Sequence, residues 1–124
     1  MSRRIIISRL LLGIWVVLLS WLMLSPLDSI PTFEFLNWPE ADKLVHGTSF
    51  AILGMLSVSS LGESQQRFIL ILIIWSVYAM MVEIFQFYIP GRSFEILDIL
   101  ADVIGAIVGY FAFIQFNNIK QGNL

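Results

Sequence analysis

The chain has 124 residues, of which 58% are hydrophobic and 13% charged, and its formal net charge is -2. A soluble domain of this size needs more polar residues around its core, so the balance indicates a small membrane protein with one domain, residues 1–124. The chain has no cysteine, which excludes disulfides, thiolate metal sites and cysteine nucleophiles. A basic stripe typical of nucleic-acid binding and a Gly-rich phosphate loop are also missing from the sequence.

The first predicted element is a membrane-spanning helix over about residues 5–24. This stretch is apolar except for Ser8, Arg9 and Ser20, and twenty helical residues rise about 30 Å, the thickness of the hydrocarbon core. A cleaved signal peptide is the alternative. The apolar stretch is too long for one, and no small-x-small cleavage pattern follows Leu24. We therefore expect the helix to be retained.

Three further membrane helices are predicted over about residues 38–61, 68–89 and 94–116. The linker over residues 25–37 contains two prolines and several aromatic residues, so we expect it to lie in the headgroup layer. Pro90 and Gly91 end the third helix, and Ser93 is a candidate N-cap for the fourth. The expected fold is an all-α membrane protein, a bundle of four transmembrane helices.

The distribution of Lys and Arg predicts that both termini lie in the cytoplasm. In this N-in/C-in arrangement two basic residues, Lys43 and Arg92, lie outside, and five lie inside. The inner residues are Arg3, Arg4, Arg9, Arg67 and Lys120. The reverse arrangement violates the positive-inside rule.

Polar residues of the membrane-spanning stretches converge on one layer just below the outer surface. In the predicted topology the second helix enters from outside, the third exits outward and the fourth re-enters. Ionisable groups in hydrocarbon cost about a few kcal/mol each and are functional-site candidates by default. The candidate ligand-binding residues of this layer are Asp42, Lys43, His46, Glu83, Gln86, Arg92, Asp98 and Asp102.

Helical spacing places the acids of the fourth helix on one face. Asp98, Asp102, Gly105 and Gly109 are separated by four, three and four residues, which makes a single stripe. Glycines at such spacing let a neighbouring helix approach closely. We therefore expect the acidic end of the stripe to face other helices rather than lipid.

Acidic groups outnumber basic ones in this layer. Four acids lie beside Lys43, Arg92 and a histidine that can charge, and Glu95 adds another acid at the rim. Polar contacts between membrane helices are often purely structural, and pairing alone is the alternative for each residue. Excess buried acid must be protonated, bind a cation or meet a ligand. The excess favours a functional site.

These residues carry a resemblance to the VanZ-like family over about residues 42–110. The matching motifs are, in order, Asp42-Lys43-x-x-His46-x-x-x-Phe50, Glu83-x-x-Gln86, Pro90-Gly91-Arg92-Ser93 and Asp98-x-x-x-Asp102-x-x-Gly105-x-x-x-Gly109. One departure is Asp102, where the family usually has asparagine. The resemblance implies a multi-pass protein of the bacterial plasma (inner) membrane. It also implies a link to glycopeptide resistance, because the family's founding member is associated with low-level resistance to teicoplanin.

A binding module for a cell-envelope component is the first functional hypothesis. The ligand would be a lipid-linked cell-wall precursor or another amphiphile in the lipid bilayer. Lys43 and Arg92 would take a phosphate or carboxylate, and the acids would take amide, hydroxyl or amine groups. We expect Arg92 to fold over the site and place its guanidinium at the mouth.

Two other functions remain open. One is a membrane-embedded hydrolase or transferase that acts on a lipid headgroup, with His46, Glu83 and Asp98 as candidate catalytic residues. These three and Asp102 are also candidate ligands for a divalent cation, and carboxylates with water suit Mg²⁺ or Mn²⁺ better than zinc. The other is a proton or cation pathway, which would need a further subunit. No nucleic-acid partner is expected, and the sequence leaves an oligomer open.

Overall fold

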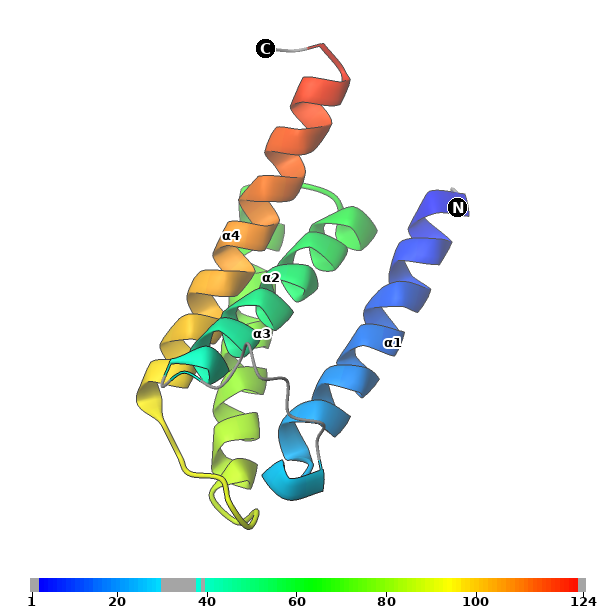
Figure 1. The fold of residues 1–124 in the computed structure, drawn as a ribbon. Coiled ribbons are helices and arrows are strands. Elements are labelled where there is room, and N and C mark those ends of the chain that lie inside the picture. The colour runs from blue at the N-terminus through cyan, green and yellow to red at the C-terminus, as the bar shows by residue number, and fades with distance from the viewer. Residues whose placement is uncertain (1–2, 30–37, 39, 123–124) are drawn as a thin grey trace.

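The computed structural model describes residues 3–29, 38 and 40–122. This part of the chain contains four long α-helices, one short 3-10 helix and no strand, so the predicted all-α bundle of four helices is confirmed (Figure 1). The helices are α1 (Arg3–Leu24), η1 (Leu27–Ser29), α2 (Ala41–Leu61), α3 (Gln65–Gln86) and α4 (Ile96–Lys120).

All four α-helices are long and apolar enough to cross a membrane. Large apolar side chains point outward along them, among them Val17, Ile73 and Val108, which are 69%, 56% and 56% exposed in the isolated chain. Such apolar side chains on the outer faces of long helices fit contact with lipid rather than water. The chain is therefore a multi-pass membrane protein.

The third helix begins three residues before its predicted start. Ser64 occupies the N-cap position, and its Oγ accepts the backbone N–H of Arg67 at 3.2 Å. This bond satisfies one of the free donors at the start of the helix, so the helix extends into the polar loop. The helix ends at Gln86 rather than 89, and the chain turns before Gly91, which has a φ of 79°.

The other helix boundaries also differ from the predicted ones. The first helix begins at Arg3, and α2 begins at Ala41 rather than 38. The prediction that Ser93 caps α4 is wrong, because Glu95 occupies the N-cap position and its side chain makes no capping bond. At its other end α4 continues to Lys120, past the predicted end at residue 116. Most of the linker, residues 30–37, lies outside the described residues.

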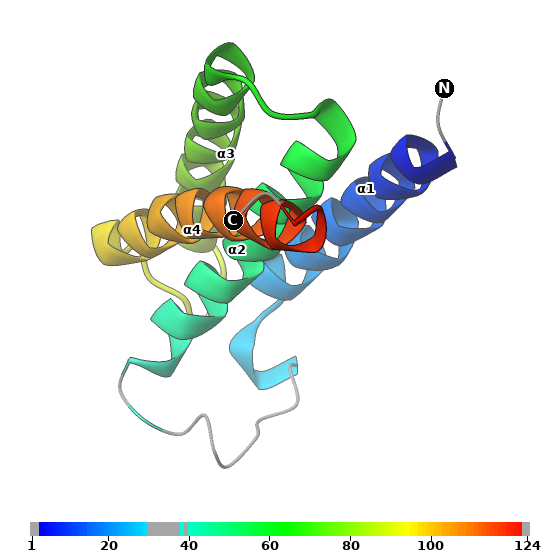
Figure 2. The same cartoon turned by 90° about the horizontal axis from the view of Figure 1, so that it is seen from above.

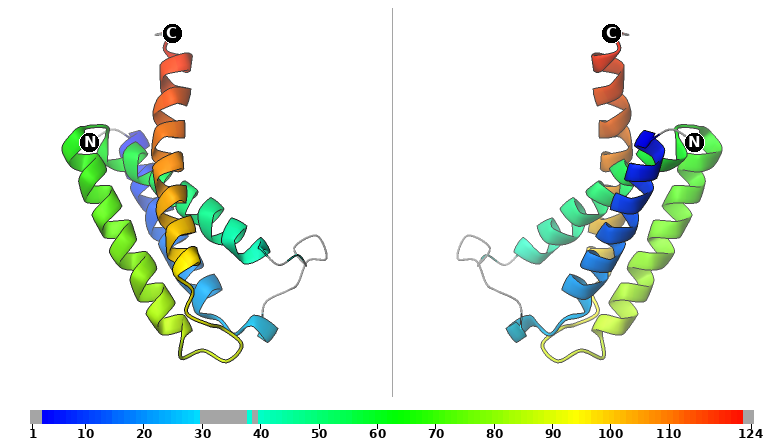
Figure 3. Two further views of the ribbon diagram at one scale, coloured as in Figure 1. Left: turned by 90° about the vertical axis from the view of Figure 1, so that its left-hand side faces the viewer. Right: turned by 90° about the vertical axis from the view of Figure 1, so that its right-hand side faces the viewer.

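Both chain ends lie at one end of the bundle, and the α3–α4 loop lies at the opposite end (Figure 1). Seen from above, α4 crosses over α2, with α3 and α1 on either side (Figure 2). The side views show that α2 is inclined to the other helices (Figure 3). This inclined helix packs against all three of the others, most extensively against α4.

Small residues bring α2 and α4 into close contact. A Cβ on Gly105 would overlap the carbonyl group of Gly47, and a Cβ on Gly109 would overlap that of Ala51. Both glycines are buried, as are Asp98 and Asp102 of the same stripe. The predicted stripe therefore does face a neighbouring helix, and it holds the acids of α4 against α2.

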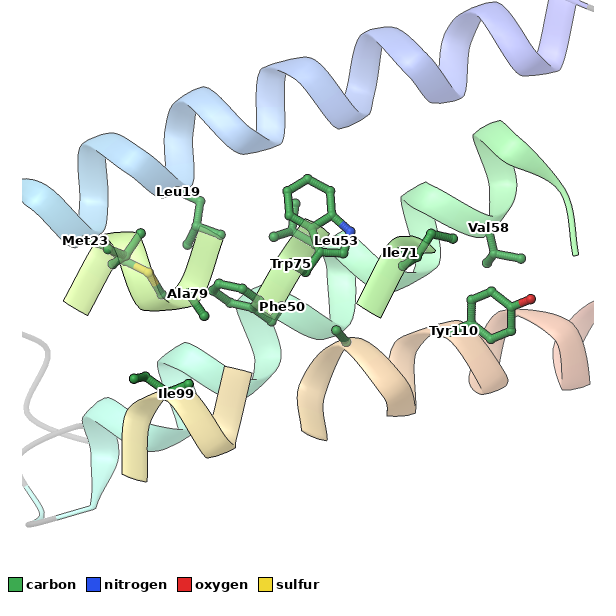
Figure 4. Packing of buried hydrophobic residues seen from close by; sticks show 12 residues of the cluster. Leu19, Met23, Phe50, Leu53, Val58, Ile71, Trp75, Ala79, Ile99 and Tyr110 are labelled. Atoms are coloured by element: carbon green, nitrogen blue, oxygen red, sulfur yellow. The ribbon is translucent and has the colours of Figure 1, made fainter. Parts of the chain in front are cut away.

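An apolar core fills the space between the helices and includes residues from all four (Figure 4). Among its members are Phe50 and Leu53 from α2 and Trp75 from α3. The indole N–H of Trp75 donates to Ser57 Oγ at 2.8 Å, which satisfies a polar group in the apolar layer. The remaining core residues are Leu19, Met23, Val58, Ile71, Ala79, Val82, Ile99, Ala106 and Tyr110.

Candidate functional site

A polar pocket lies between the first turns of α2, the end of α3, the α3–α4 loop and the first turns of α4. Its volume is about 190 Å³. It lies toward the end of the bundle opposite the chain termini. The lining residues are Asp42, His46, Gln86, Gly91, Arg92, Ser93, Glu95 and Asp98.

A buried histidine and a buried aspartate pair across the contact between α2 and α4. Nδ1 of His46 lies 3.0 Å from Asp102 Oδ1, and the aspartate side chain has no exposed surface. An ionised carboxylate only accepts hydrogen bonds, so this pairing assigns the proton to Nδ1. The other ring nitrogen, Nε2, lies 3.8 Å from Asp98 Oδ2. The imidazole is thus held in one orientation between two acids.

Glu83 is fully buried in the last turns of α3, with 0% of its surface exposed. Its Oε2 accepts the backbone N–H of Glu95 at 2.9 Å, which ties α3 to the start of α4. Its Oε1 has no hydrogen-bond partner in the described part of the chain, and the same holds for Asp98 Oδ1 and Asp102 Oδ2. Buried polar atoms are nearly always paired, so three such oxygens in one place call for an explanation.

Lys43 lies at the rim of the pocket among carboxylates. Its Nζ is 2.9 Å from Glu95 Oε2, 3.4 Å from Asp98 Oδ1 and 3.5 Å from Asp42 Oδ2. The hydrogen bond from Lys43 holds the pKa of Glu95 below its ordinary value. The ammonium group therefore neutralises the outer acids of the site.

Arg92 lines the pocket from the α3–α4 loop, but its guanidinium is turned toward α1. Its Nε donates to the carbonyl of Ser25 at 2.9 Å, and its Nη2 donates to that of Leu22 at 2.8 Å. Burial lowers the pKa of Arg92. These donors satisfy carbonyls that the end of a helix leaves free. The expectation that the guanidinium folds over the mouth is corrected accordingly, since at least two of its donors hold α1.

Replacing Arg92 with glutamine is therefore expected to lower the melting temperature of the purified protein in detergent. The variant loses two hydrogen bonds from a charged donor, each worth about 1.5–3 kcal/mol. Arg4→Gln is the matched control, because Arg4 is exposed at the far end of α1. Equal melting temperatures for the two variants would contradict this structural role.

Most of the predicted site residues come together. Asp42, His46, Gln86, Arg92 and Asp98 line the pocket, Lys43 lies at its rim, and Glu83 and Asp102 lie buried beside it. Asp42 is exposed, and the side-chain Nε2 of Gln86 donates to the carbonyl of Met23 at 2.9 Å.

Two contributions to the site were not in the predicted set. Glu95 is the closest partner of Lys43 and also donates its backbone N–H to Glu83. The sequence had indicated Glu95 only as a further acid at the rim, not as a binding residue. The end of α1 contributes backbone carbonyls, which any residue type supplies, so no side-chain pattern marks them.

Comparison with known proteins identifies a family. The family model described as VanZ/LLP1 matches residues 6–117, a longer stretch than the motifs cover and one that includes most of α1. No match was found among curated proteins or among solved structures.

Proposed function

This chain belongs to the VanZ/LLP1 family, and from that premise we propose that its polar pocket binds the headgroup of a cell-envelope amphiphile. The ligand class is a lipid-linked cell-wall precursor or a lipid of similar headgroup chemistry. The binding face is the outer side of the bacterial plasma membrane. An envelope ligand also fits the association of the VanZ-like family with glycopeptide resistance.

The observation that carries this proposal is a set of buried acid oxygens that accept no hydrogen bond from the described residues, of which Asp98 Oδ1 has the Lys43 ammonium 3.4 Å away. Glu83 Oε1, Asp98 Oδ1 and Asp102 Oδ2 are buried without a hydrogen-bond partner among the described residues. Each such group costs about 1–3 kcal/mol, and more when charged. A headgroup with amide, hydroxyl or amine donors would reach Asp98 directly, because Asp98 lines the pocket, whereas Glu83 and Asp102 lie fully buried behind the lining residues. A purely structural cluster would gain more from full pairing within the protein.

The size of the pocket fits part of a headgroup. Its volume of about 190 Å³ is below the 300–1,000 Å³ typical of sites that enclose a drug-sized ligand. The lipid chains would stay in the bilayer, beside the apolar outer faces of the helices.

The test uses the purified protein in lipid nanodiscs and a labelled lipid-linked cell-wall precursor. We expect saturable binding of the precursor, and weaker or no binding of the same lipid without its headgroup. Equal binding of both lipids would show that only the bilayer surface of the helices is involved, and would overturn the proposal.

The outer location of the pocket is supported by the charge distribution and the fold. The starts of α1 and α3 and the end of α4, which carry the five inner basic residues, lie at the same end of the bundle as the chain termini (Figure 1). Lys43 and Arg92 belong to the opposite end. Under the positive-inside rule the pocket then faces outward.

Single-cysteine labelling tests this orientation cleanly, because the chain has no cysteine of its own. In intact cells Asp28→Cys is expected to react with an impermeant thiol reagent, and Asn118→Cys to react only after the cells are opened. The opposite pattern would place the pocket on the cytoplasmic side.

A second candidate function is hydrolysis or group transfer on the bound headgroup. The 3.0 Å contact between His46 Nδ1 and Asp102 Oδ1 favours it, because a carboxylate that orients a histidine prepares Nε2 as a general base. Release of a headgroup product from the labelled precursor, lost in His46→Gln, would support catalysis. An unchanged precursor after binding would leave the pocket as a binding site alone.

A further inference from the structure

Two groups of acidic and histidine side chains lie close enough together to hold a metal ion. The outer group is Asp42, Glu95 and Asp98, and the inner group is His46, Glu83 and Asp98. The outer group already contains a cation, since Lys43 Nζ lies within 3.5 Å of an oxygen of each member. An ammonium in that position takes the place of a bound ion.

The inner group differs in its charge balance. Lys43 reaches only one member of it, Asp98, through Oδ1. In the described part of the chain, the other ion pairs of this region join His46 to Asp98 and to Asp102. Arg92 gives its donors to backbone carbonyls of α1. Glu83, Asp98 and Asp102 thus share one imidazole, and the ammonium of Lys43, which reaches Asp98, is also paired with the outer acids. This leaves negative charge that a divalent cation would offset.

The spacing of the inner group suits a small ion. One ligand atom from each of its three residues lies within 4.8 Å of the others, and His46 Nε2 is 3.8 Å from Asp98 Oδ2. Two ligand atoms bound at about 2.1 Å are at most about 4.2 Å apart, so small side-chain rotations close the site. Glu83 Oε1, which has no exposed surface and no hydrogen-bond partner among the residues that the structure describes, is the unsatisfied atom that points to a ligand here.

The hydrogen bond between His46 and Asp102 prepares the imidazole for this role. A metal-binding histidine almost always donates its other ring N–H to a carboxylate or carbonyl, which fixes the ring and the tautomer. Asp102 Oδ1 accepts the hydrogen bond of Nδ1–H in this way at 3.0 Å. The other ring nitrogen, Nε2, faces Asp98 and is available to bind an ion.

We infer that His46, Glu83 and Asp98 bind a divalent cation, with Asp102 as the residue that positions the imidazole. An ion that accepts one imidazole nitrogen and two carboxylate oxygens is Mn²⁺ or Zn²⁺ rather than a soft metal. Its remaining coordination positions would open to the pocket, where they would take water or a phosphate oxygen of the headgroup. The inference rests on the proposed function only in using the same pocket.

The test measures binding of Mn²⁺ alone to the purified protein in nanodiscs of uncharged lipid. The electron paramagnetic resonance signal of free Mn²⁺ reports the amount bound, and added Zn²⁺ reports competition for the same site. We expect one Mn²⁺ per chain in the wild type, with at least a tenfold weaker affinity in Asp98→Asn and His46→Gln. Asp28→Asn, an exposed aspartate outside the site, is the matched control and is expected to bind as the wild type does.

Two Asp102 variants test its positioning role. Asn keeps an oxygen that accepts the Nδ1 proton, so Asp102→Asn is expected to bind Mn²⁺ within a few-fold of the wild type. Asp102→Ala removes the acceptor and is expected to weaken binding by about 10–100-fold. Equal binding by these two variants would overturn the positioning role.

The metal site is overturned if the wild type takes up no Mn²⁺ or Zn²⁺, or if Asp98→Asn and Asp28→Asn bind equally. This result is independent of precursor binding. Precursor binding that persists in a chelator, without any metal uptake, would remove the metal site alone. Metal uptake without precursor binding would keep the metal site and remove the proposed function.

Discussion

Leucine in place of Gly105 is expected to prevent the chain from reaching its native fold. A Cβ at this position would overlap the backbone of Gly47 across the contact between α2 and α4. Overpacking that side chains can absorb costs about 1–3 kcal/mol. At Gly105 the new side chain would meet backbone atoms, so α2 and α4 would have to separate. The loss in the free energy of unfolding would approach the whole stability of a domain, about 5–15 kcal/mol. Size-exclusion chromatography and thermal melting in detergent measure the result.

Gly13→Leu is the matched control for this substitution. Gly13 also lies in a membrane helix, α1, but a Cβ built there meets nothing within 4 Å. The control is expected to elute and melt as the wild type does. If Gly105→Leu also gave a monodisperse protein with an unchanged melting temperature, the close packing of α2 on α4 would be wrong.

The second large effect is expected for Glu83→Gln, which should bind the precursor more weakly and keep its fold. A glutamine oxygen still accepts the backbone N–H of Glu95, so the bond that ties α3 to α4 survives. The amide NH₂ replaces the carboxylate oxygen that accepts no hydrogen bond within the described part of the chain, and one buried negative charge disappears. The ligand loses a charged hydrogen-bond acceptor, worth about 1.5–3 kcal/mol or roughly a 10- to 150-fold weaker affinity.

Glu63→Gln makes the same chemical change at an exposed position in the loop between α2 and α3, at the other end of the bundle. It is expected to bind the precursor with the affinity of the wild type. Equal losses in the two glutamine variants would indicate a general effect of charge and would remove Glu83 from the site. The comparison is made by equilibrium binding in nanodiscs.

The membrane helices and the polar layer could be predicted from the sequence for simple reasons. Apolar runs of about twenty residues leave few alternatives to a spanning helix. Once the helices alternate in direction, the ends that carry His46, Glu83 and Asp98 must lie at the same level. The small residues Gly105 and Gly109 identified the face of α4 that meets a neighbour, and the structure shows that α2 is this neighbour.

Contacts to backbone atoms could not be predicted. The side chains of Arg92 and Gln86 both donate hydrogen bonds to backbone carbonyls at the end of α1. Such acceptors have no sequence signature. The importance of Glu95 was underestimated for the same reason, because its backbone N–H, rather than its side chain, binds Glu83. The helix ends at Gln86 and Ile96 depend on the conformation of the loop between them, which local residue preferences define poorly.

The departure of Asp102 from the family's usual asparagine has a physical account. The sequence grouped this residue with the acids that would meet a ligand, whereas the structure places it behind His46, where it does not itself line the pocket. At that place the imidazole needs an oxygen acceptor for Nδ1–H, and both aspartate and asparagine supply one. Aspartate in place of asparagine at position 102 therefore keeps the orientation of His46 and adds a carboxylate next to the imidazole.

We propose that the buried acids beside the pocket bind a ligand rather than stabilise the helix bundle. The most direct test is the change in melting temperature when the lipid-linked precursor is added to the wild type and to Glu83→Gln. A ligand at one hundred times its dissociation constant stabilises a protein by about 2.7 kcal/mol, so the wild type should melt higher with the precursor. Glu83→Gln should melt as the ligand-free wild type does without the precursor, and its shift with the precursor should fall to about 0.3–1.4 kcal/mol for a 150- to 10-fold weaker affinity. A Glu83→Gln variant that melts well below the wild type, together with no precursor shift in either protein, would contradict the claim.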